Sequence, residues 1–401
     1  MKHILSLLIV LLPCAPMRAQ QPTFPSLLRE ILRNNTSLRT LRADLQSTRQ
    51  ENAAAMVLPD PEAEVSHDFG SPKGVPARTN VSVSQQLDWG VLTGRRRRLA
   101  RVADDAAHLA YRLEAQRVAG EADEALVRVI YSNRLVAELA RRDTLAVSLQ
   151  SLYESKYAKG DITLLELNKV RLTTSVARAE RQRALSERQS VLAELQRLNG
   201  GQPVELSDTI YPYDASTLPP LSTLQSILES GIAVQAAETA VRRSEAEAAL
   251  AKSAGWPSFS VGFQGEYVRD NNYNGFSLGV SLPLWGGKRR QLRSARTKVQ
   301  AARLDVADVR LQQSARLSQQ YATSVSLAES ADRLDRDLQA TSNAALLHKS
   351  LAAGQISLLD YLLESSFYYS ARTAQLEAER DAQLSLSALR VLLYDGTEGE
   401  Q

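Results

Sequence analysis

A long internal duplication constrains the fold of this chain more than any other feature of its sequence. Leu28, Ile31 and Leu32 have counterparts 196 residues later, at Leu224, Ile227 and Leu228. Further landmarks recur in the same order: Trp89-Gly90 and Trp285-Gly286, the basic runs at 94–97 and 287–290, and the segments GDITLLEL from Gly160 and GQISLLDY from Gly354. Self-similarity at a fixed period indicates a repeated architecture. We therefore interpret the chain as two copies of one unit of roughly 195 residues.

The duplication and the flanking segments divide the chain into five parts. Residues 1–19 have a basic start and a short apolar run from Ile4 to Leu12, as in a secretory signal peptide cleaved after Ala19. The apolar run is too short to span a bilayer. Cys14 leaves lipidation open as an alternative, although Pro13 fits a lipidation motif poorly. The other predicted parts are a first repeat at 20–200, a linker at 201–220, a second repeat at 221–394 and a tail at 395–401.

The composition excludes several classes of function. Lys and Arg total 48 and Asp and Glu total 45, so the net charge is +3; without Lys2 and Arg18 of the leader the totals are 46 and 45, or +1. A nucleic-acid binder needs a larger basic excess. One Cys and four dispersed His give no disulfide framework and no metal-ligand spacing. No catalytic motif stands out, so we expect no enzyme, cofactor or metal.

Each repeat is predicted to contain a helix, a β-hairpin, a very long helix, a tight turn and a returning helix. The opening helices are predicted at 26–57 and 221–254 from their apolar spacing. Period-two alternation predicts strands at about 61–71 and 77–88, and at about 257–268 and 275–285, with a loop from Arg269 to Gly275 in the second hairpin. The long helices run from Gly94 to Gly160 and from Gly287 to Gly354, roughly 100 Å each. Aromatic residues are only 5% of the chain, which favours such long helices.

The strands alternate apolar and polar residues, which suits a sheet between lipid and water. A lipid-facing strand needs a closed barrel, because unpaired backbone groups are costly in a membrane. Known single-chain barrels begin at about eight strands, and this chain supplies four. We therefore expect three copies to form a twelve-stranded barrel, with the helices continuing the cylinder.

The chain resembles the outer membrane efflux protein family, the TolC-like exit ducts of tripartite pumps. The resemblance rests on the duplication, on the strand-to-helix motif SLPLWGG at 281–287, and on the turn motifs YAKGDITLLEL and LAAGQISLLDY. The counterpart SQQLDWG at 84–90 departs from the pattern, with Gln86 where proline is usual. The resemblance covers essentially the whole mature chain.

The resemblance implies a mainly α fold with a small β part. It implies a homotrimer with a 12-stranded outer-membrane β-barrel and an α-helical periplasmic barrel. The protein would lie in the bacterial outer membrane and extend into the periplasm. It would export small molecules passively when docked to a periplasmic adaptor and an inner-membrane transporter of the RND or ABC type.

The two turns at the ends of the long helices are the predicted adaptor-docking tips. Glycine supplies the positive φ that ends a helix, and Thr163 or Ser357 can cap the next helix. A plain turn is the alternative interpretation. The resemblance assigns docking to Gly160, Ile162, Thr163, Gly354, Ile356 and Ser357.

Acidic residues at or just beyond the turns are predicted to line the periplasmic entrance. A threefold axis would repeat each carboxylate into a ring, and acidic rings favour cations. The resemblance points to Asp360, with Glu166 as its counterpart, and to Glu364; Asp161 lies at the turn itself. The alternative is an acid stabilised by the dipole of a helix N-terminus.

Basic and aromatic residues at the strand-to-helix junctions are predicted to lie at the membrane interface. Positive charge at a helix start opposes the helix dipole, so an external anion such as lipid phosphate is expected. A solvated face is the alternative for the basic residues, and core packing for the tryptophans. The predicted set is Trp89, Trp285, Arg95, Arg96, Arg97, Lys288, Arg289 and Arg290.

Two other functions compete with an efflux duct. The same fold can serve type I protein secretion, and the sequence does not separate the two. A periplasmic coiled-coil scaffold without a channel is the second alternative, and it requires the hairpins to be soluble.

Overall fold

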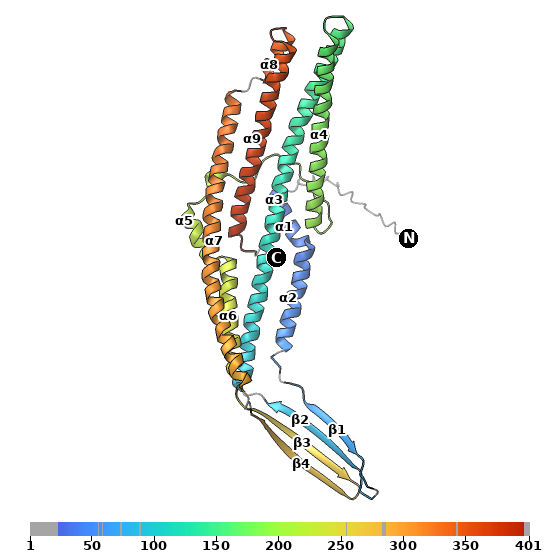
Figure 1. The fold of residues 1–401 in the computed structure, drawn as a ribbon, viewed down its shortest axis with the longest axis vertical. Helices are drawn as coiled ribbons and strands as arrows, with labels where there is room; N and C mark the ends of the chain where they lie inside the picture. The colour runs from blue at the N-terminus through green and yellow to red at the C-terminus, as the bar shows by residue number, and fades with distance from the viewer. Residues whose placement is uncertain are drawn as a thin grey trace, which may run out of the picture.

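The computed structural model describes residues 23–396, except 55, 58, 73, 88–89, 254, 283–285 and 342–343. The predicted signal peptide, Cys14, Trp89 and Trp285 lie outside these residues. The fold is elongated and mainly helical with one small sheet at one end (Figure 1). The predicted fold class is thus confirmed at this level.

The elements follow the same order twice along the chain, except that the second series has one more helix, α8, among the described residues. The first series comprises α1 (Phe24–Asn34), α2 (Thr36–Ala54), β1 (Glu62–Asp68), β2 (Arg78–Leu87), α3 (Gly90–Ala158) and α4 (Leu164–Leu198). The linker contains one short 3-10 helix, η1 (Ala215–Thr217). The second series comprises α5 (Leu221–Glu229), α6 (Ile232–Ser253), β3 (Ser258–Val268), β4 (Asn271–Ser281), α7 (Gly287–Ala340), α8 (Ala344–Ala352) and α9 (Leu358–Leu393).

The opening helix of each half is broken, so the prediction of one continuous helix is wrong in both places. Between α1 and α2, the Asn35 side chain accepts a hydrogen bond from the backbone N–H of Leu38 at 3.1 Å and donates one to the Leu198 carbonyl at 3.0 Å. This is how an N-capping side chain starts a new helix. Between α5 and α6, the break falls at Ser230-Gly231, where Gly231 N–H bonds to the Leu228 carbonyl.

The two long helices also differ from the prediction. Helix α3 is continuous over 69 residues, or roughly 100 Å, and it begins at Gly90 rather than at Gly94. Helix α7 ends at Ala340, so the prediction of an unbroken helix to Gly354 is wrong. Thr341 follows the last residue of α7, and its side chain competes for a backbone hydrogen-bond acceptor. The Thr341 hydroxyl donates to the Asp337 carbonyl at 2.8 Å.

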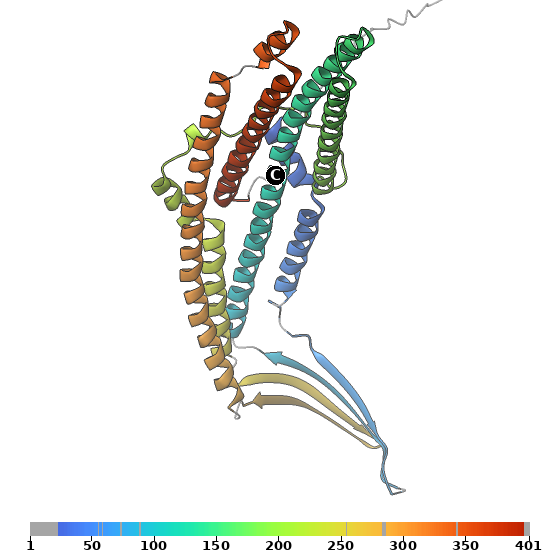
Figure 2. The same ribbon diagram turned by 45° about the horizontal axis from the view of Figure 1, so that its top comes forward.

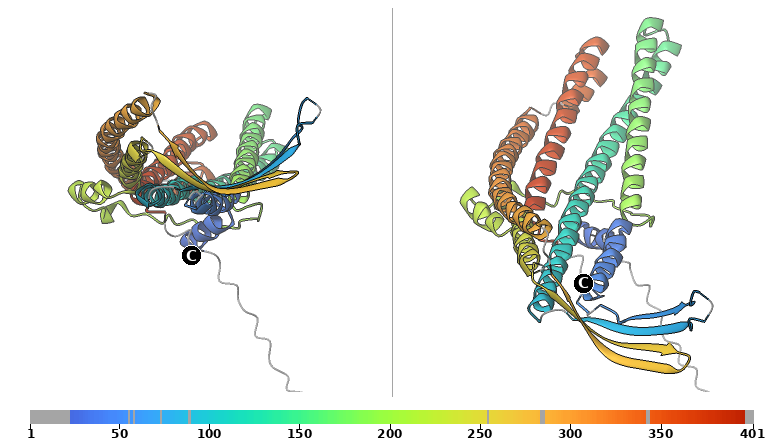
Figure 3. Two further views of the ribbon diagram at one scale, coloured as in Figure 1. Left: turned by 90° about the horizontal axis from the view of Figure 1, so that it is seen from below. Right: turned by 60° about the horizontal axis from the view of Figure 1, so that its bottom comes forward.

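The sheet is antiparallel throughout, in the order β1-β2-β3-β4. Its second hairpin is tighter than predicted, because Val268 pairs with Asn271 and only Arg269 and Asp270 form the turn. Strand β4 therefore spans 271–281 instead of 275–285. Seen from below, the sheet is curved (Figure 3).

The helices form a wall that runs from the sheet to the far end of the molecule. In the half away from the sheet, α7, α9, α3 and α4 lie side by side in that order; nearer the sheet the order is α7, α6, α3 and α2 (Figures 1 and 2). The largest apolar cluster lies where α1, α3, α4 and the linker meet. It includes the fully buried Ile31, Leu126, Ile130 and Leu195.

The linker crosses this wall and is held to it by buried polar contacts. The Tyr213 hydroxyl and the Ser387 hydroxyl both donate to the Asp123 carboxylate, which joins the linker to α3 and α9. Tyr213 N–H also donates to Gln383, and the Gln383 amide donates back to the Tyr213 carbonyl at 2.7 Å. Burial raises the pKa of Asp123, against the lowering effect of these hydrogen bonds.

Candidate functional site: the sheet and the helix tips

One face of the sheet is apolar and open. Cross-strand partners share a face, and the pairs Phe259–Val280, Val261–Leu278 and Phe263–Phe276 place these side chains together. The exposed fraction is 93% at Phe276 and 83% at Leu278. The other members of this face include Ala63, Val65, Val81, Val83 and Leu87. Apolar patches of this extent mark a site of contact with a protein or a membrane.

The opposite face of the sheet is polar and carries small side chains. It includes Glu62, Glu64, Ser66, Ser82, Ser84, Gly262, Gln264, Ser277 and Gly279. At the hairpin end, Arg78 pairs with Asp68 at 2.9 Å and with Glu266 at 3.5 Å. The prediction of amphipathic hairpins is therefore confirmed for the described strands, and the sheet separates an apolar surface from a polar one.

The sheet is open at both edges. Within the described residues, β1 pairs only with β2 and β4 pairs only with β3. An edge strand leaves a row of backbone N–H and C=O groups without partners, and it is a template for pairing with another chain. The helical wall has exposed leucines at its edges as well: Leu165 and Leu172 on α4, and Leu304 and Leu311 on α7.

At the far end of the wall, both predicted tips are glycine-terminated helix ends. Gly160 and Gly354 have φ values of +79° and +70°. The N–H of Asp161 bonds to the Lys156 carbonyl at 3.0 Å, and the N–H of Gln355 bonds to the Ser350 carbonyl at 2.9 Å. This pattern is the Schellman motif, in which a left-handed residue closes a helix.

The helix that follows each tip begins with a capping box. Thr163 accepts a hydrogen bond from the backbone N–H of Glu166, and the Glu166 carboxylate accepts one from Thr163 N–H at 2.8 Å. Ser357 and Asp360 repeat the arrangement. The predicted capping by Thr163 and Ser357 is confirmed. The bonds from Thr163 lower the pKa of Glu166. Glu166 and Asp360 thus stabilise the starts of α4 and α9.

The two tips share one apolar cluster. Ile162 and Ile356 are half-buried against it, and its buried members are Leu149, Tyr153, Leu167, Val170, Leu351, Leu358 and Tyr361. Gly160, Thr163, Gly354 and Ser357 are exposed around it, as are Asp360 and Glu364. The structure therefore brings the predicted docking residues to one end of the molecule.

Beside these tips lie exposed apolar residues that sequence reasoning missed. Leu359, Leu363 and Phe367 on α9 are 62%, 52% and 64% exposed. Their spacing of four residues places them on one helix face, opposite the buried face that contains Tyr361 and Ser365. The spacing was visible in the sequence, but it is the same signal that a core-facing stripe gives.

The basic residues near the sheet do not behave as one set. Arg95 is half-buried, and its guanidinium donates to the Ala249 carbonyl at 2.6 Å and to the Ser253 hydroxyl at the C-terminal end of α6. A helix C-terminus is a favourable site for a cation, so Arg95 has an internal partner instead of the external anion that we expected. Arg96 is half-buried, while Arg97, Lys288, Arg289 and Arg290 are exposed.

The described residues contain no helix that is apolar and long enough to cross a membrane. They also contain no cluster of three or more His, Cys, Asp or Glu side chains suited to a metal ion.

The fold and these surfaces define a class: an elongated helical wall that ends in an amphipathic, open-edged sheet, as in outer-membrane channels. Three solved channels share this fold. The open-state MtrE channel of Neisseria gonorrhoeae has a TM-score of 0.76 at 19% identity, over 94% of this chain and 89% of that one. The CmeC channel of Campylobacter jejuni has a TM-score of 0.75 at 14% identity, over 93% of this chain and 85% of that one. VceC of Vibrio cholerae has a TM-score of 0.74 at 16% identity, over 92% of this chain and 96% of that one.

The sequence points to the same family. Residues 223–393 match the family model described as outer membrane efflux protein. No curated protein matches the chain significantly. The resemblance to the outer membrane efflux protein family is thus confirmed by sequence for residues 223–393. The solved channels share the fold over nearly the whole chain.

Proposed function

We propose that the protein is the outer-membrane exit duct of a tripartite efflux system. Three copies would close a barrel of twelve strands, because each copy supplies four strands in one sheet. The helical walls would continue this barrel into the periplasm as a second cylinder. Transport through the duct would be passive, driven by an inner-membrane transporter of the RND or ABC type.

The observation that carries this proposal is the sheet. Its apolar face is exposed at Phe276 and Leu278, its polar face is lined with serine, glycine and carboxylates, and both edges are open. Lipid tolerates such a sheet only when its edges are paired. Closure by neighbouring copies places the apolar face on lipid and the polar face on a water-filled lumen.

The helix edges support the same closure. Leu304 and Leu311 on α7 are seven residues apart and 73% and 71% exposed, which is the spacing of a coiled-coil seam. On the opposite edge of the wall, α4 exposes Leu165 and Leu172. Near the sheet, α2 of one copy would pack on the α7 edge of the next, and at the far end α4 would pack on the edge formed by α7 and α8, so that both edges would be buried in a homotrimer.

The two tips are the proposed docking surface for the periplasmic adaptor. Six residues form it: Gly160, Ile162, Thr163, Gly354, Ile356 and Ser357. They share one end of the molecule and one apolar cluster. Glu166, Asp360 and Glu364 would contribute carboxylates to the entrance, although the first two also serve the capping boxes.

The opposite end of the wall is the proposed lipid interface. The exposed Arg97, Lys288, Arg289 and Arg290 lie just past the sheet, within reach of lipid phosphate by snorkelling. Arg95 and Arg96 lie in the same run. Trp89 and Trp285 remain predicted members of an aromatic girdle at this level.

Two measurements test the duct. In cell fractionation, the protein should be recovered in the outer membrane, whereas a scaffold would be found in the soluble fraction. Purified protein in planar bilayers should give discrete conductance steps and migrate as a trimer after cross-linking. Absence of conductance from correctly assembled trimers would refute a channel.

A further inference from the structure

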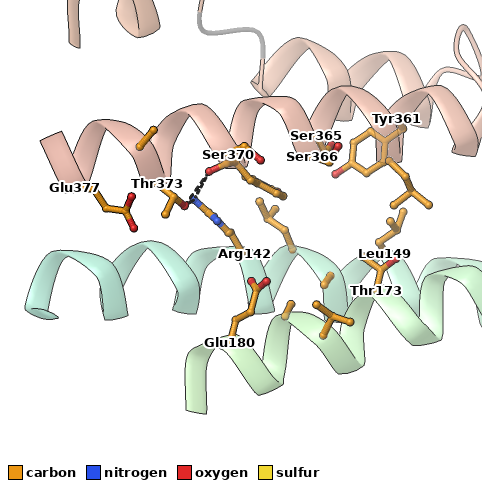
Figure 4. A pocket seen from close by; sticks show the side chains of 17 residues that line it. Arg142, Leu149, Thr173, Glu180, Tyr361, Ser365, Ser366, Ser370, Thr373 and Glu377 are labelled. Carbon is orange, nitrogen blue, oxygen red and sulfur yellow. Dashed lines mark hydrogen bonds between the residues drawn. The ribbon is translucent and has the colours of Figure 1, made fainter. Parts of the chain in front are cut away.

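A groove in the helical wall starts at the apolar cluster beneath the tips and extends along the wall toward the sheet. It lies on α3, between α4 and α9, and has a volume of about 520 Å³ (Figure 4). Cavities that bind small molecules have volumes of about 300–1,000 Å³. Leu149, Tyr361 and Ser365 are buried in its floor, and Val176 of α4 and Ala374 of α9 line its sides.

The cation that lines the groove is already satisfied by the protein. Arg142 pairs with Glu138 at 2.8 Å, and both side chains are 8% exposed. The Arg142 guanidinium also donates to the Tyr369 carbonyl at 3.1 Å and to the Thr373 hydroxyl at 3.2 Å, and it lies 4.6 Å from the centre of the Tyr369 ring. Few donors are therefore left to Arg142 for an anionic ligand.

The acids that line the groove are in the opposite situation. Glu180 of α4 and Glu377 of α9 are exposed at the same end of the groove as Arg142 (Figure 4). In the part of the chain that the structure describes, no side chain donates a hydrogen bond to either carboxylate. The groove thus combines an apolar floor and tyrosine rings with free hydrogen-bond acceptors of negative charge.

We propose that this groove binds an amphiphilic organic cation. Its apolar rings would lie on Leu149 and Tyr361, and its cationic nitrogen would lie between Glu180 and Glu377. Burial of apolar area and charge-assisted hydrogen bonds would act together. The inference deepens the proposed duct function, on which it rests, by naming a class of cargo that the wall itself recognises.

The volume of the groove is that of a site for a molecule of drug size. The two carboxylates in its lining favour a cationic ligand over a neutral or anionic one.

The test measures binding of two related dyes to the purified full chain in lipid nanodiscs. Rhodamine 6G is a cationic xanthene, and fluorescein is its anionic relative. Fluorescence anisotropy should give at least tenfold tighter binding of rhodamine 6G. The double variant Glu180→Gln/Glu377→Gln should weaken rhodamine 6G binding about tenfold, which is about 1.4 kcal/mol, and leave fluorescein binding unchanged. Equal affinities for the two dyes would overturn the proposal.

Two controls separate the groove from general charge and from misfolding. Glu194→Gln/Glu329→Gln removes two exposed acids from α4 and α7 outside the groove, and it should bind rhodamine 6G like the wild type. Ala374→Trp fills the groove from an exposed position and should abolish binding while helix content stays constant. If the control pair weakens binding as much as the groove pair, the groove does not recognise the cation.

The failures of this inference and of the duct are distinguishable. If the trimer conducts but rhodamine 6G does not bind, the duct stands and the cation site is wrong. If a cysteine at Ala374 forms cross-links to a second polypeptide in cells and rhodamine 6G binds no variant differently, the groove is a protein-docking surface. Lack of conductance would instead refute the duct.

Discussion

Replacing Phe276 by arginine tests the placement of the sheet in lipid. Phe276 is the sixth of the eleven residues of β4, lies opposite Phe263 with ring centres 6.1 Å apart, and is 93% exposed. Eleven residues span about 36 Å along a strand, or about 25 Å across the membrane at a tilt of 45°. Its side chain would therefore lie near the bilayer midplane.

Arginine at the midplane of a transmembrane barrel costs about 2–4 kcal/mol. Three copies per barrel would raise the cost to about 6–12 kcal/mol per trimer, comparable to the whole stability of an ordinary domain. The matched control is Ser277→Arg. Ser277 is the next residue along β4 and belongs to the polar face, so its arginine would enter the lumen at little cost.

The assay is assembly of purified protein into lipid vesicles, followed by urea titration of the trimer. Phe276→Arg should lower the folded fraction strongly and shift the urea midpoint downward, while Ser277→Arg should match the wild type. Equal assembly of the two variants would refute the placement of Phe276 in lipid. Higher soluble yield of Phe276→Arg with intact trimers would also refute it, because a face in water gains from a charge.

Three further predictions concern the tips and the linker. Gly354→Ala should destabilise its tip by about 1–2 kcal/mol, because alanine is unfavourable at φ +70°, and amide hydrogen exchange at residues 355–358 should become faster. The control is Gly287→Ala, at a helix start with open space around it, which should leave exchange at 355–358 unchanged. Thr163→Ala should cost about 0.5–2 kcal/mol at the start of α4, whereas Thr163→Ser should retain the cap. Because Thr163 lowers the pKa of Glu166, the stabilisation by ionised Glu166 is present above its unfolded pKa and is lost as the pH falls through its folded pKa. Hydrogen exchange at the start of α4 should therefore become faster in acid, and Thr163→Ala should reduce this dependence on pH. Burial raises the pKa of Asp123, so the contribution of Asp123 to stability is complete below its unfolded pKa and is lost as the pH rises through its folded pKa. The Tm of Asp123→Asn trimers should therefore vary less between acid and neutral pH than the Tm of wild-type trimers. An identical pH dependence of the two Tm values would contradict this.

Patterns that repeat over short distances predicted the strands and their faces. Alternation at Phe259, Val261 and Phe263 assigns one face of β3 without knowledge of its partners. The turn of the second hairpin was harder to predict from the sequence. Residues 271–275 read NNYNG, and Asn and Gly are poor strand formers. Pairing with residues 264–268 of β3 places them in the sheet nevertheless, because register along a hairpin overrides local preference.

The break between α1 and α2 depended on a contact that the sequence does not display. Asn35 ends one helix and starts another because its amide reaches the Leu198 carbonyl, 163 residues away. Residues 34–37 read NNTS, which are residue types of a helix start, but no glycine marks the end of α1. The tips were different. Gly160 and Thr163, like Gly354 and Ser357, carry the helix-stop and helix-start signals within four residues, so local chemistry was sufficient.

The acids near the tips and the acids that line the groove differ in what the sequence indicates about them. Glu166 and Asp360 occur at the third position after a capping residue in both halves, and the capping box explains their recurrence without an entrance. Repetition alone is therefore weak support for a gate, and Glu364, one turn beyond Asp360, is the sharper test of one. Glu180 and Glu377 give no motif at all, since one lies on α4 and the other on α9, and only the packing of both helices on α3 brings them to one groove. In a duplicated chain, features shared by both copies first reflect the common fold, and a site built between the copies has to be found in the structure.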